Sequence, residues 1–417
     1  MDILKTKVSR WWLVASLYIT CVFYLLFQGG KTSFMVFMIV NVLLVYLILG
    51  RWSGVARTQG TRRLQHKGGT GESLPAGTRQ EVKLQLRVPG IWPIPYVMVR
   101  EKLVREGQGE MPFEIPFVPD LRRGGEISYL TPPLARGNYR FAPTVCSTWD
   151  IFGLFEHTGQ FSSPGEFRVL PQTIAIRYWR QLNRGMKGPF SHAASSRSSK
   201  ETTQLNGVRE YHYGDRLSRV HWNATAKTGE WKSKEFEREA LPRTVVILDR
   251  NEQAYPQGDR FELAVSVAAS LFEHGIRRET AMGLVSVGDT AEGFSPRSTP
   301  AQRKVLMSHL VGVAADSPLP LYTALKQAGT LLAPGSFAVL ITPQGGEETV
   351  KSMQWLERTG LVPCMIYITD DQAPGAASQD ESWQRLIRSR GWPFYTVRHL
   401  QELPGQLEGG GVSAIGS

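Results

Sequence analysis

An aspartate and a histidine, Asp215 and His221, lie six residues apart near the middle of the chain. A carboxylate that holds an imidazole makes a general acid–base pair when a nucleophile comes within hydrogen-bond reach. Ser218 and Thr225 offer hydroxyl groups nearby, but neither lies in a nucleophile-elbow pattern. We therefore favour a structural or binding role for this segment, and keep a hydrolase that uses Asp215 and His221 as the alternative.

A second candidate is Asp249, which follows the apolar run Thr244–Leu248. Oxygen ligands suit Mg²⁺, and a cage needs several of them. Asn251 and Gln253 supply only amides beside the one carboxylate. We expect a degenerate metal site at Asp249 and Asn251, with no metal and no other cofactor bound. The carboxyl edge of a sheet can still serve as a binding surface.

Basic and aromatic residues interleave between positions 207 and 239. Trp222 and Trp231 could stack on bases, and six basic side chains could contact phosphates: Arg209, Arg216, Arg219, Lys227, Lys232 and Lys234. Four glutamates interrupt this track: Glu230, Glu235, Glu237 and Glu239. Nucleic acid is therefore disfavoured, although a membrane-proximal nucleic-acid-binding protein stays a further alternative. An acidic protein partner and packing between domains are the better interpretations.

The composition excludes several classes of protein. The glycine run Gly68–Gly71 lacks the lysine and the strand–helix context of a phosphate-binding loop, so we expect no ATPase. Since no nucleophile setting accompanies Asp215 and His221, we expect no enzyme. Cys21, Cys146 and Cys364 lie too far apart for a zinc cluster and fit a reducing compartment. Residues 1–73 and 177–243 each carry a net charge of +7, within a total of +11, so the basic excess is not spread over the whole surface.

Two apolar runs open the chain, Trp11–Phe27 and Phe34–Leu49, and Gln28–Ser33 separates them. Each reaches roughly 25 Å as a helix, the short end of a membrane span. The first run lacks a small-residue cleavage site, which argues against a signal peptide. Lysines and arginines flank the pair on both outer sides, and only Lys31 lies between the runs. The sequence predicts a two-span hairpin in the cell membrane with both termini in the cytoplasm.

The remaining chain divides by its periodicity. The run Glu81–Val88 alternates apolar and polar residues, and similar short runs follow it, which predicts an antiparallel β-sandwich over residues 79–172. Apolar strands that alternate with helical patterns predict a doubly wound α/β domain over 244–403. We interpret 1–51 as the hairpin, 52–78 as a linker, 173–243 as a linker with the polar-aromatic segment, and 404–417 as a flexible tail.

The segment Gly207–Glu239 resembles the signature of a bacterial family known as domain of unknown function 58. The matching positions are Gly207, Arg209, Tyr211, Gly214, Asp215, Arg219, Val220, Trp222, Thr225, Ala226 and Lys227. His221 lies at a variable position of the pattern, and we include it among the candidate residues for partner binding or structure. Upstream, Arg136–Tyr139 and Asp150–Phe155 are similar to the β-domain of the same family, and the two-span hairpin fits its usual layout.

The resemblance implies a von Willebrand factor A-like α/β domain. In that fold Asp249 would begin a metal motif, but Pro343 stands where a second aspartate would belong. It also implies a MoxR-type AAA+ ATPase and a transglutaminase-like membrane protein as partners. The family has no assigned reaction. We therefore expect a membrane-anchored, non-enzymatic adaptor that works with the ATPase in assembly or remodelling of an envelope complex.

Overall fold

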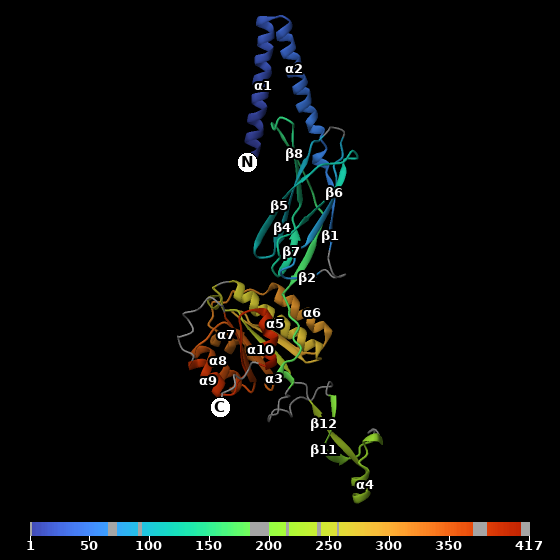
Figure 1. The fold of residues 1–417 in the computed structure, drawn as a ribbon, viewed down its shortest axis with the longest axis vertical. Coiled ribbons are helices and arrows are strands. Elements are labelled where there is room, and N and C mark those ends of the chain that lie inside the picture. The colour runs from blue at the N-terminus through green and yellow to red at the C-terminus, as the bar shows by residue number, and fades with distance from the viewer. Residues whose placement is uncertain are drawn as a thin grey trace. The chain divides into compact units, whose positions relative to one another are not determined.

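The computed structural model describes residues 2–65, 73–90, 94–183, 200–213, 217–239, 243–256, 258–369 and 382–409 (Figure 1). The chain forms two compact units, Met1–Leu170 and Pro171–Ser417. The first unit holds a helical hairpin and two β-sheets. The second holds a two-stranded sheet and a six-stranded sheet with helices.

Two long helices begin the first unit, α1 (Asp2–Gln28) and α2 (Lys31–Leu49). Gly29 and Gly30 make the turn between them with φ of 56° and 95°, a conformation that glycine adopts without strain. Both helices are long and apolar enough to cross a membrane. Most of their large apolar side chains are exposed, which a soluble helical hairpin would avoid.

Ten strands follow the hairpin in the first unit. They are β1 (Gln59–Gln65), β2 (Ser73–Pro75), β3 (Glu81–Arg87), β4 (Val97–Arg105), β5 (Gly109–Phe117), β6 (Gly124–Leu130), β7 (Gly137–Phe141), β8 (Thr144–Trp149), β9 (Glu156–Phe161) and β10 (Glu166–Leu170). One sheet has the order β1-β3-β6, and the other has β2-β10-β7-β4-β8-β9 with β5 paired to β4. The pairs are antiparallel except β2 with β10, which is parallel.

The two sheets share one apolar interior. The alternation in β3 places Leu84 and Leu86 inward, where they cluster with Val97 and Val99 of β4 in the other sheet. A second cluster joins Leu103 of β4 with residues of β7 and β10. Side chains of opposing sheets therefore interdigitate, as in a sandwich.

The prediction of a linker over residues 52–78 is wrong for much of that range. Val55 and Thr58 are buried, and β1 pairs with β3 along its whole length. Gly159 of β9 packs so closely that a Cβ there would lie 1.9 Å from the Val55 carbonyl oxygen. The chain between α2 and the sheets is thus packed against the sheets. Residues 66–72 lie outside the described part of the chain.

The six-stranded sheet of the second unit has the order β15-β14-β13-β16-β17-β18. Its elements are β13 (Thr244–Asp249), α5 (Gly258–Arg277), β14 (Met282–Val287), β15 (Glu292–Arg297), α6 (Pro300–Gly312), α7 (Leu321–Gln327), β16 (Phe337–Thr342), α8 (Glu347–Arg358), β17 (Val362–Ile368), α9 (Ser382–Ser389) and β18 (Phe394–Val397). All neighbours are parallel except β14 with the edge strand β15. Strands β13, β14 and β16 are buried at every residue, which requires cover on both faces.

Two boundaries of this unit differ from the sequence prediction. Trp179 lies in the predicted linker, yet it is fully buried, and the carbonyl of Ile176 is 2.9 Å from Nδ1 of His274. The predicted flexible tail begins with a helix, α10 (Leu403–Gly409), which buries Leu407. Trp179 and Leu407 lie in short segments where apolar residues are mixed with polar ones. Because such segments are too short to show a clear hydrophobic periodicity, the sequence did not predict the burial of these two side chains. Residues 410–417 and the serine-rich run Ser191–Ser199 lie outside the described residues.

Candidate functional site

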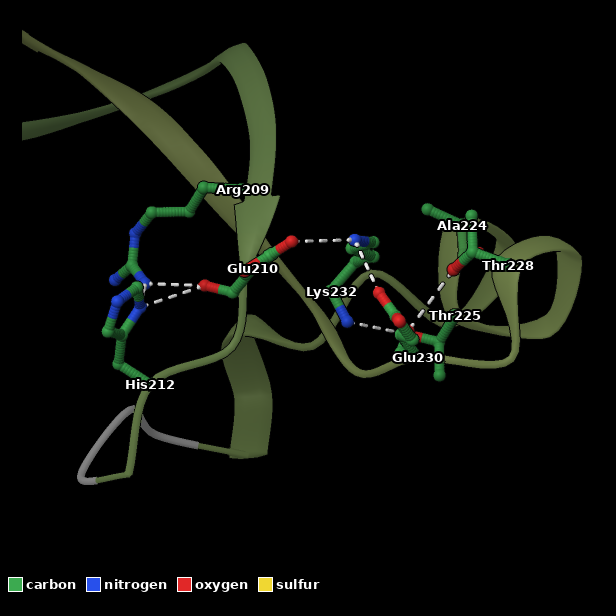
Figure 2. A network of polar contacts seen from close by, with 8 residues as sticks. All are labelled: Arg209, Glu210, His212, Ala224, Thr225, Thr228, Glu230 and Lys232. Atoms are coloured by element: carbon green, nitrogen blue, oxygen red, sulfur yellow. Dashed lines mark hydrogen bonds and ion pairs between the residues drawn. The ribbon is translucent and has the colours of Figure 1, made fainter.

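The polar-aromatic segment of the sequence forms a β-hairpin with a helical insertion (Figure 2). Strands β11 (Lys200–Glu210) and β12 (Lys232–Glu239) pair antiparallel, with Glu210 opposite Lys232. The connection contains a 3₁₀ turn, Leu217–Arg219, and the short helix α4 (Trp222–Thr228). We call residues 200–239 the signature hairpin.

His221 is the N-cap of α4. Its ring Nδ1 accepts a hydrogen bond of 3.1 Å from the amide of Ala224, and its own amide donates to the carbonyl of Lys232 at 2.8 Å. An N-cap side chain satisfies one of the amides that the first helical turn leaves unpaired. The imidazole of His221 therefore caps α4, a structural role that the sequence alone did not predict.

Thr225 and Gly229 close the insertion back onto the hairpin. The hydroxyl of Thr225 accepts a hydrogen bond of 3.0 Å from the amide of Lys232, the first residue of β12. Gly229 ends α4 with φ of 74°, and its amide donates to the Thr225 carbonyl. The insertion is thereby tied to the start of β12 by its backbone and by a signature side chain.

Charged side chains at this junction form a small network (Figure 2). The ammonium of Lys232 lies 3.3 Å from Glu230 and 3.6 Å from Glu210. Both glutamates are more than two-thirds exposed, so solvent screens these pairs and their contribution to stability is small. Arg209 donates to the carbonyl of Glu210 and contacts the ring of His212.

Aromatic side chains gather on the surface of the same connection. The ring centroids of Trp222 and Trp231 lie 5.9 Å apart, and those of Tyr211 and Trp231 lie 5.6 Å apart. Trp222 is 61% exposed and Trp231 is 50% exposed, and Tyr213 is fully exposed. Large aromatic side chains that stay exposed in a cluster mark interaction surfaces more often than folding cores.

The remaining predicted site residues have varied positions. Gly207 pairs with Glu235 inside the hairpin, and Lys227 is exposed on α4. Gly214 and Asp215 lie outside the described residues, as does the side chain of Arg219, so the proposed acid–base pair is not tested. Val220, one of the matching signature positions, is buried and forms an isolated bridge with Ser233, a buried residue that sequence reasoning missed. Ser233 lies in the largely polar run Lys232–Glu239, where the sequence carries no signal of burial.

Asp249 ends β13 and is buried. Its carboxylate accepts hydrogen bonds from the hydroxyl of Thr342 at 2.7 Å and from the amide of Asn251 at 3.0 Å. Burial is the main cause that raises the pKa of Asp249 from 3.8 to about 6, and the two hydrogen bonds oppose this shift. Desolvation therefore outweighs hydrogen bonding here.

Asn251 is engaged on both ends of its amide. Its Nδ2 donates to the carbonyl of Leu319 at 2.6 Å, and its Oδ1 accepts from the amide of Ala254 at 3.0 Å. These contacts brace two loops and leave Asn251 poorly placed to serve as a ligand. Within the described ranges, no three His, Cys, Asp or Glu side chains come together as metal ligands. The donor set around Asp249 does not fit a divalent cation.

Comparisons with known proteins place the chain near one family. Residues 207–351 match the family described as "Protein of unknown function DUF58", a range that includes most of the signature hairpin and extends into α8. The chain is also similar to "Uncharacterized protein YeaD" of Bacillus subtilis (strain 168). The two are 25% identical over 305 residues, which cover 72% of this chain and 73% of that protein.

Solved structures give only distant likenesses. A von Willebrand factor type A protein from Catenulispora acidiphila matches 41% of this chain and 42% of its own, with 15% identity and a TM-score of 0.28. Proximal thread matrix protein 1 from the mussel byssus matches 40% of this chain, with 13% identity and a TM-score of 0.29. The match spans 46% of the length of that second protein.

Proposed function

We propose that the protein is a membrane-anchored adaptor without catalytic activity of its own. Two helices hold it in the membrane, and its soluble part lies in the cytoplasm. Its signature hairpin docks a cytosolic AAA+ ATPase of the MoxR type during assembly or remodelling of an envelope complex. The C-terminal α/β unit is a von Willebrand factor A-like domain. At the position of the metal site of that fold, Asp249 is hydrogen-bonded by Thr342 and Asn251.

The aromatic cluster of the signature hairpin carries this proposal. Trp222 and Trp231 expose large apolar surfaces on a connection whose backbone is held by His221 and Thr225. Aromatic anchors on a preorganised support are typical of interface hot spots, because little conformational entropy is lost on binding. Polar side chains at its base, among them Lys232 and Glu230, supply a charged rim.

The membrane anchor rests on α1 and α2, both of which are long and apolar enough to span a bilayer. The basic residues on both outer sides of the pair favour cytoplasmic termini. An alkaline-phosphatase fusion after Arg63 would be inactive in that topology. An active fusion would overturn both the cytoplasmic location and the ATPase partner.

The hydrolase alternative receives no support from His221. Its Nδ1 accepts from the Ala224 amide, and the nearby Thr225 hydroxyl accepts from the Lys232 amide. A nucleophilic hydroxyl would donate its proton to the imidazole, whereas these two hydrogen bonds both come from backbone amides. We name a MoxR-type ATPase as the partner because of the family resemblance. The surface of the partner must be able to cover the exposed aromatic rings of the signature hairpin.

Affinity purification of the full chain from native membranes, with mild crosslinking, tests the proposal. Trp222→Ala removes the more exposed of the two tryptophan rings and is expected to weaken binding by about 30-fold if it costs about 2 kcal/mol, as interface tryptophans do. Leu386→Ala on α9 removes an exposed apolar side chain, 42% exposed, from another element and serves as the control.

We expect wild type and Leu386→Ala to recover the ATPase and Trp222→Ala to lose it. Equal recovery by all three chains would move the docking surface away from the signature hairpin. Recovery of no ATPase by wild type would contradict the proposed partner.

A further inference from the structure

One end of the β-sandwich is where the helical hairpin joins it. Strand β3 ends at Arg87 opposite the first residues of β1 and β6, and β4 begins at Val97 opposite the end of β5. Met98 pairs with Ser147, which brings the end of β8 to the same side. The loops 52–58, 118–123 and 150–155 therefore lie at this end, which we call the helix-proximal end.

Exposed apolar side chains concentrate at the helix-proximal end. In the described part of residues 52–170, the large apolar side chains that are exposed are Trp52, Tyr96, Val118, Leu121, Leu130, Ile151 and Phe152. All except Leu130 lie in or next to the loops of this end. Leu121 is fully exposed, and Trp52 and Ile151 are each 73% exposed. Scattered surface residues would not gather at one end of a sheet pair.

The turn between β8 and β9 touches both candidate membrane helices. The amide of Ile151 donates to the hydroxyl of Tyr46 on α2 at 3.1 Å, and the rings of Phe152 and Tyr46 lie 5.8 Å apart, edge to face. The rings of Phe155 and Trp11 on α1 lie 4.6 Å apart. Tyr46 is in the last turn of α2, and Trp11 begins the apolar stretch of α1. Tyrosine and tryptophan at such positions mark the membrane–water interface.

This turn is built to hold its apolar tip outward. Both carboxylate oxygens of Asp150 accept backbone hydrogen bonds, at 2.9 Å from Phe152, 3.0 Å from Leu154 and 2.7 Å from Phe155. Gly153 has φ of 65°, which allows the tight reversal. The carboxylate of Asp150 is thus hydrogen-bonded within the turn, next to the exposed apolar side chain of Ile151.

We propose that the helix-proximal end of the β-sandwich sits in the headgroup layer of the bilayer as a third membrane contact. Its apolar side chains from three separate loops enter the interface beside the two spans. Exposed arginines at the same end, Arg57, Arg87 and Arg122, suit anionic lipid headgroups. This proposal rests on the membrane anchor of the proposed function and adds a fixed orientation of the β-sandwich on the membrane.

Leu121 is the sharpest test position, because its loop is distinct from the turn that touches the helices. An environment-sensitive fluorophore is attached to Leu121→Cys in the full chain, reconstituted into vesicles of phosphatidylcholine and phosphatidylglycerol. Cys146 and Cys364 are buried, and Cys21 is replaced by alanine. The control Gln108→Cys lies in the turn at the opposite end of β4, and Val42→Cys reports the span itself.

We expect the fluorophore at Leu121→Cys to shift its emission to shorter wavelength and to be quenched by nitroxides near the headgroups. At Gln108→Cys we expect a water-like emission without quenching. Water-like emission at Leu121→Cys, with deep quenching at Val42→Cys, would overturn this proposal and leave the membrane anchor standing. Loss of quenching at Val42→Cys as well would overturn both the anchor and this proposal.

Discussion

The hydroxyl of Thr342 donates a hydrogen bond of 2.7 Å to the buried carboxylate of Asp249 and joins the carboxyl ends of β16 and β13. From β13 the chain first builds outward through β14 and then returns to add β16 on the other side. The two residues therefore meet at the point where the strand order reverses, which is the usual ligand position in open α/β sheets. In this protein the side chain of Thr342 hydrogen-bonds the Asp249 carboxylate at that position.

Asp249 makes stability depend on pH. Its pKa in the folded state is about 6, above its ordinary value of 3.8, so the folded state binds the proton more tightly than the unfolded state does. The associated stability is present below about pH 4 and is lost as the pH rises through about 6. Two pKa units correspond to a change on the order of 3 kcal/mol. Urea unfolding of the detergent-solubilised chain between pH 4 and pH 7 measures it.

Two variants control this measurement. Asp249→Asn removes the titrating group, and we expect it to flatten the pH dependence in that window. Thr342→Val removes a hydrogen bond that lowers the pKa of Asp249, so the pKa should rise further in this variant. The loss of stability with rising pH should then extend to higher pH than in the wild type. An unchanged pH profile in Asp249→Asn would contradict the assignment.

The β-sandwich contains a buried ion pair between Arg62 of β1 and Glu101 of β4. Tyr129 and Thr144 donate to the same carboxylate, and the guanidinium lies 4.0 Å from the ring centroid of Phe141. Glu101→Gln leaves a buried cation without its counter-charge, and we expect it to cost about 3–5 kcal/mol of stability.

Replacing both Arg62 and Glu101 tests whether the unpaired buried charge is what destabilises Glu101→Gln. Arg62→Met with Glu101→Leu should destabilise less than Glu101→Gln alone, because no uncompensated charge remains. Denaturant midpoints of the single and double variants give the comparison. A double variant that is less stable than the single one would show that the pair itself, beyond charge balance, stabilises the fold.

His221 is expected to act through the start of α4. His221→Ala removes the acceptor for the Ala224 amide and should cost about 1 kcal/mol, while His221→Asn should retain the cap because asparagine is a favoured N-cap residue. Hydrogen exchange at the Gly229 amide, which bonds the Thr225 carbonyl, is expected to quicken about fivefold in His221→Ala only. Equal exchange in wild type and His221→Ala would contradict the cap.

Regular periodicity was predictable from the sequence, and isolated anchors were not. The alternation of Glu81–Val88 predicted β3, and the strand–helix alternation of residues 244–403 predicted the α/β unit. Strand β1 was missed because its residues, QGTRRLQ, are mostly polar, and its ion pair with Glu101 depends on a residue 39 positions away.

The candidate site shows the same limit. The residues of the signature were identified, but the pairing of β11 with β12 was not, because neither strand has an apolar alternation. The roles of His221 and Thr225 follow from backbone geometry that only the fold supplies. For Asp249, the sequence correctly indicated a strand end, but the partner hydroxyl of Thr342 lies 93 residues away.

Gly159 is expected to control the junction between the helices and the sheets. In Gly159→Ala the new Cβ would lie 1.9 Å from the carbonyl oxygen of Val55, so the segment after α2 must move. We expect a loss of about 1–3 kcal/mol, as for other overpacked sites. Limited proteolysis between residues 50 and 65 measures the loosening. Gly124→Ala, whose Cβ would meet its nearest atom at 3.4 Å, is the tolerated control, and equal cleavage of both variants would contradict the packed junction.

The adaptor account depends most directly on what touches Trp222 in the cell. A photoreactive amino acid at position 222 of the full chain, activated in intact cells, captures proteins within a few ångströms of the aromatic cluster. The account predicts a crosslinked product that contains a AAA+ ATPase, and no such product from position 386 on α9. An ATPase product from position 386 alone, or only internal products from position 222, would contradict it.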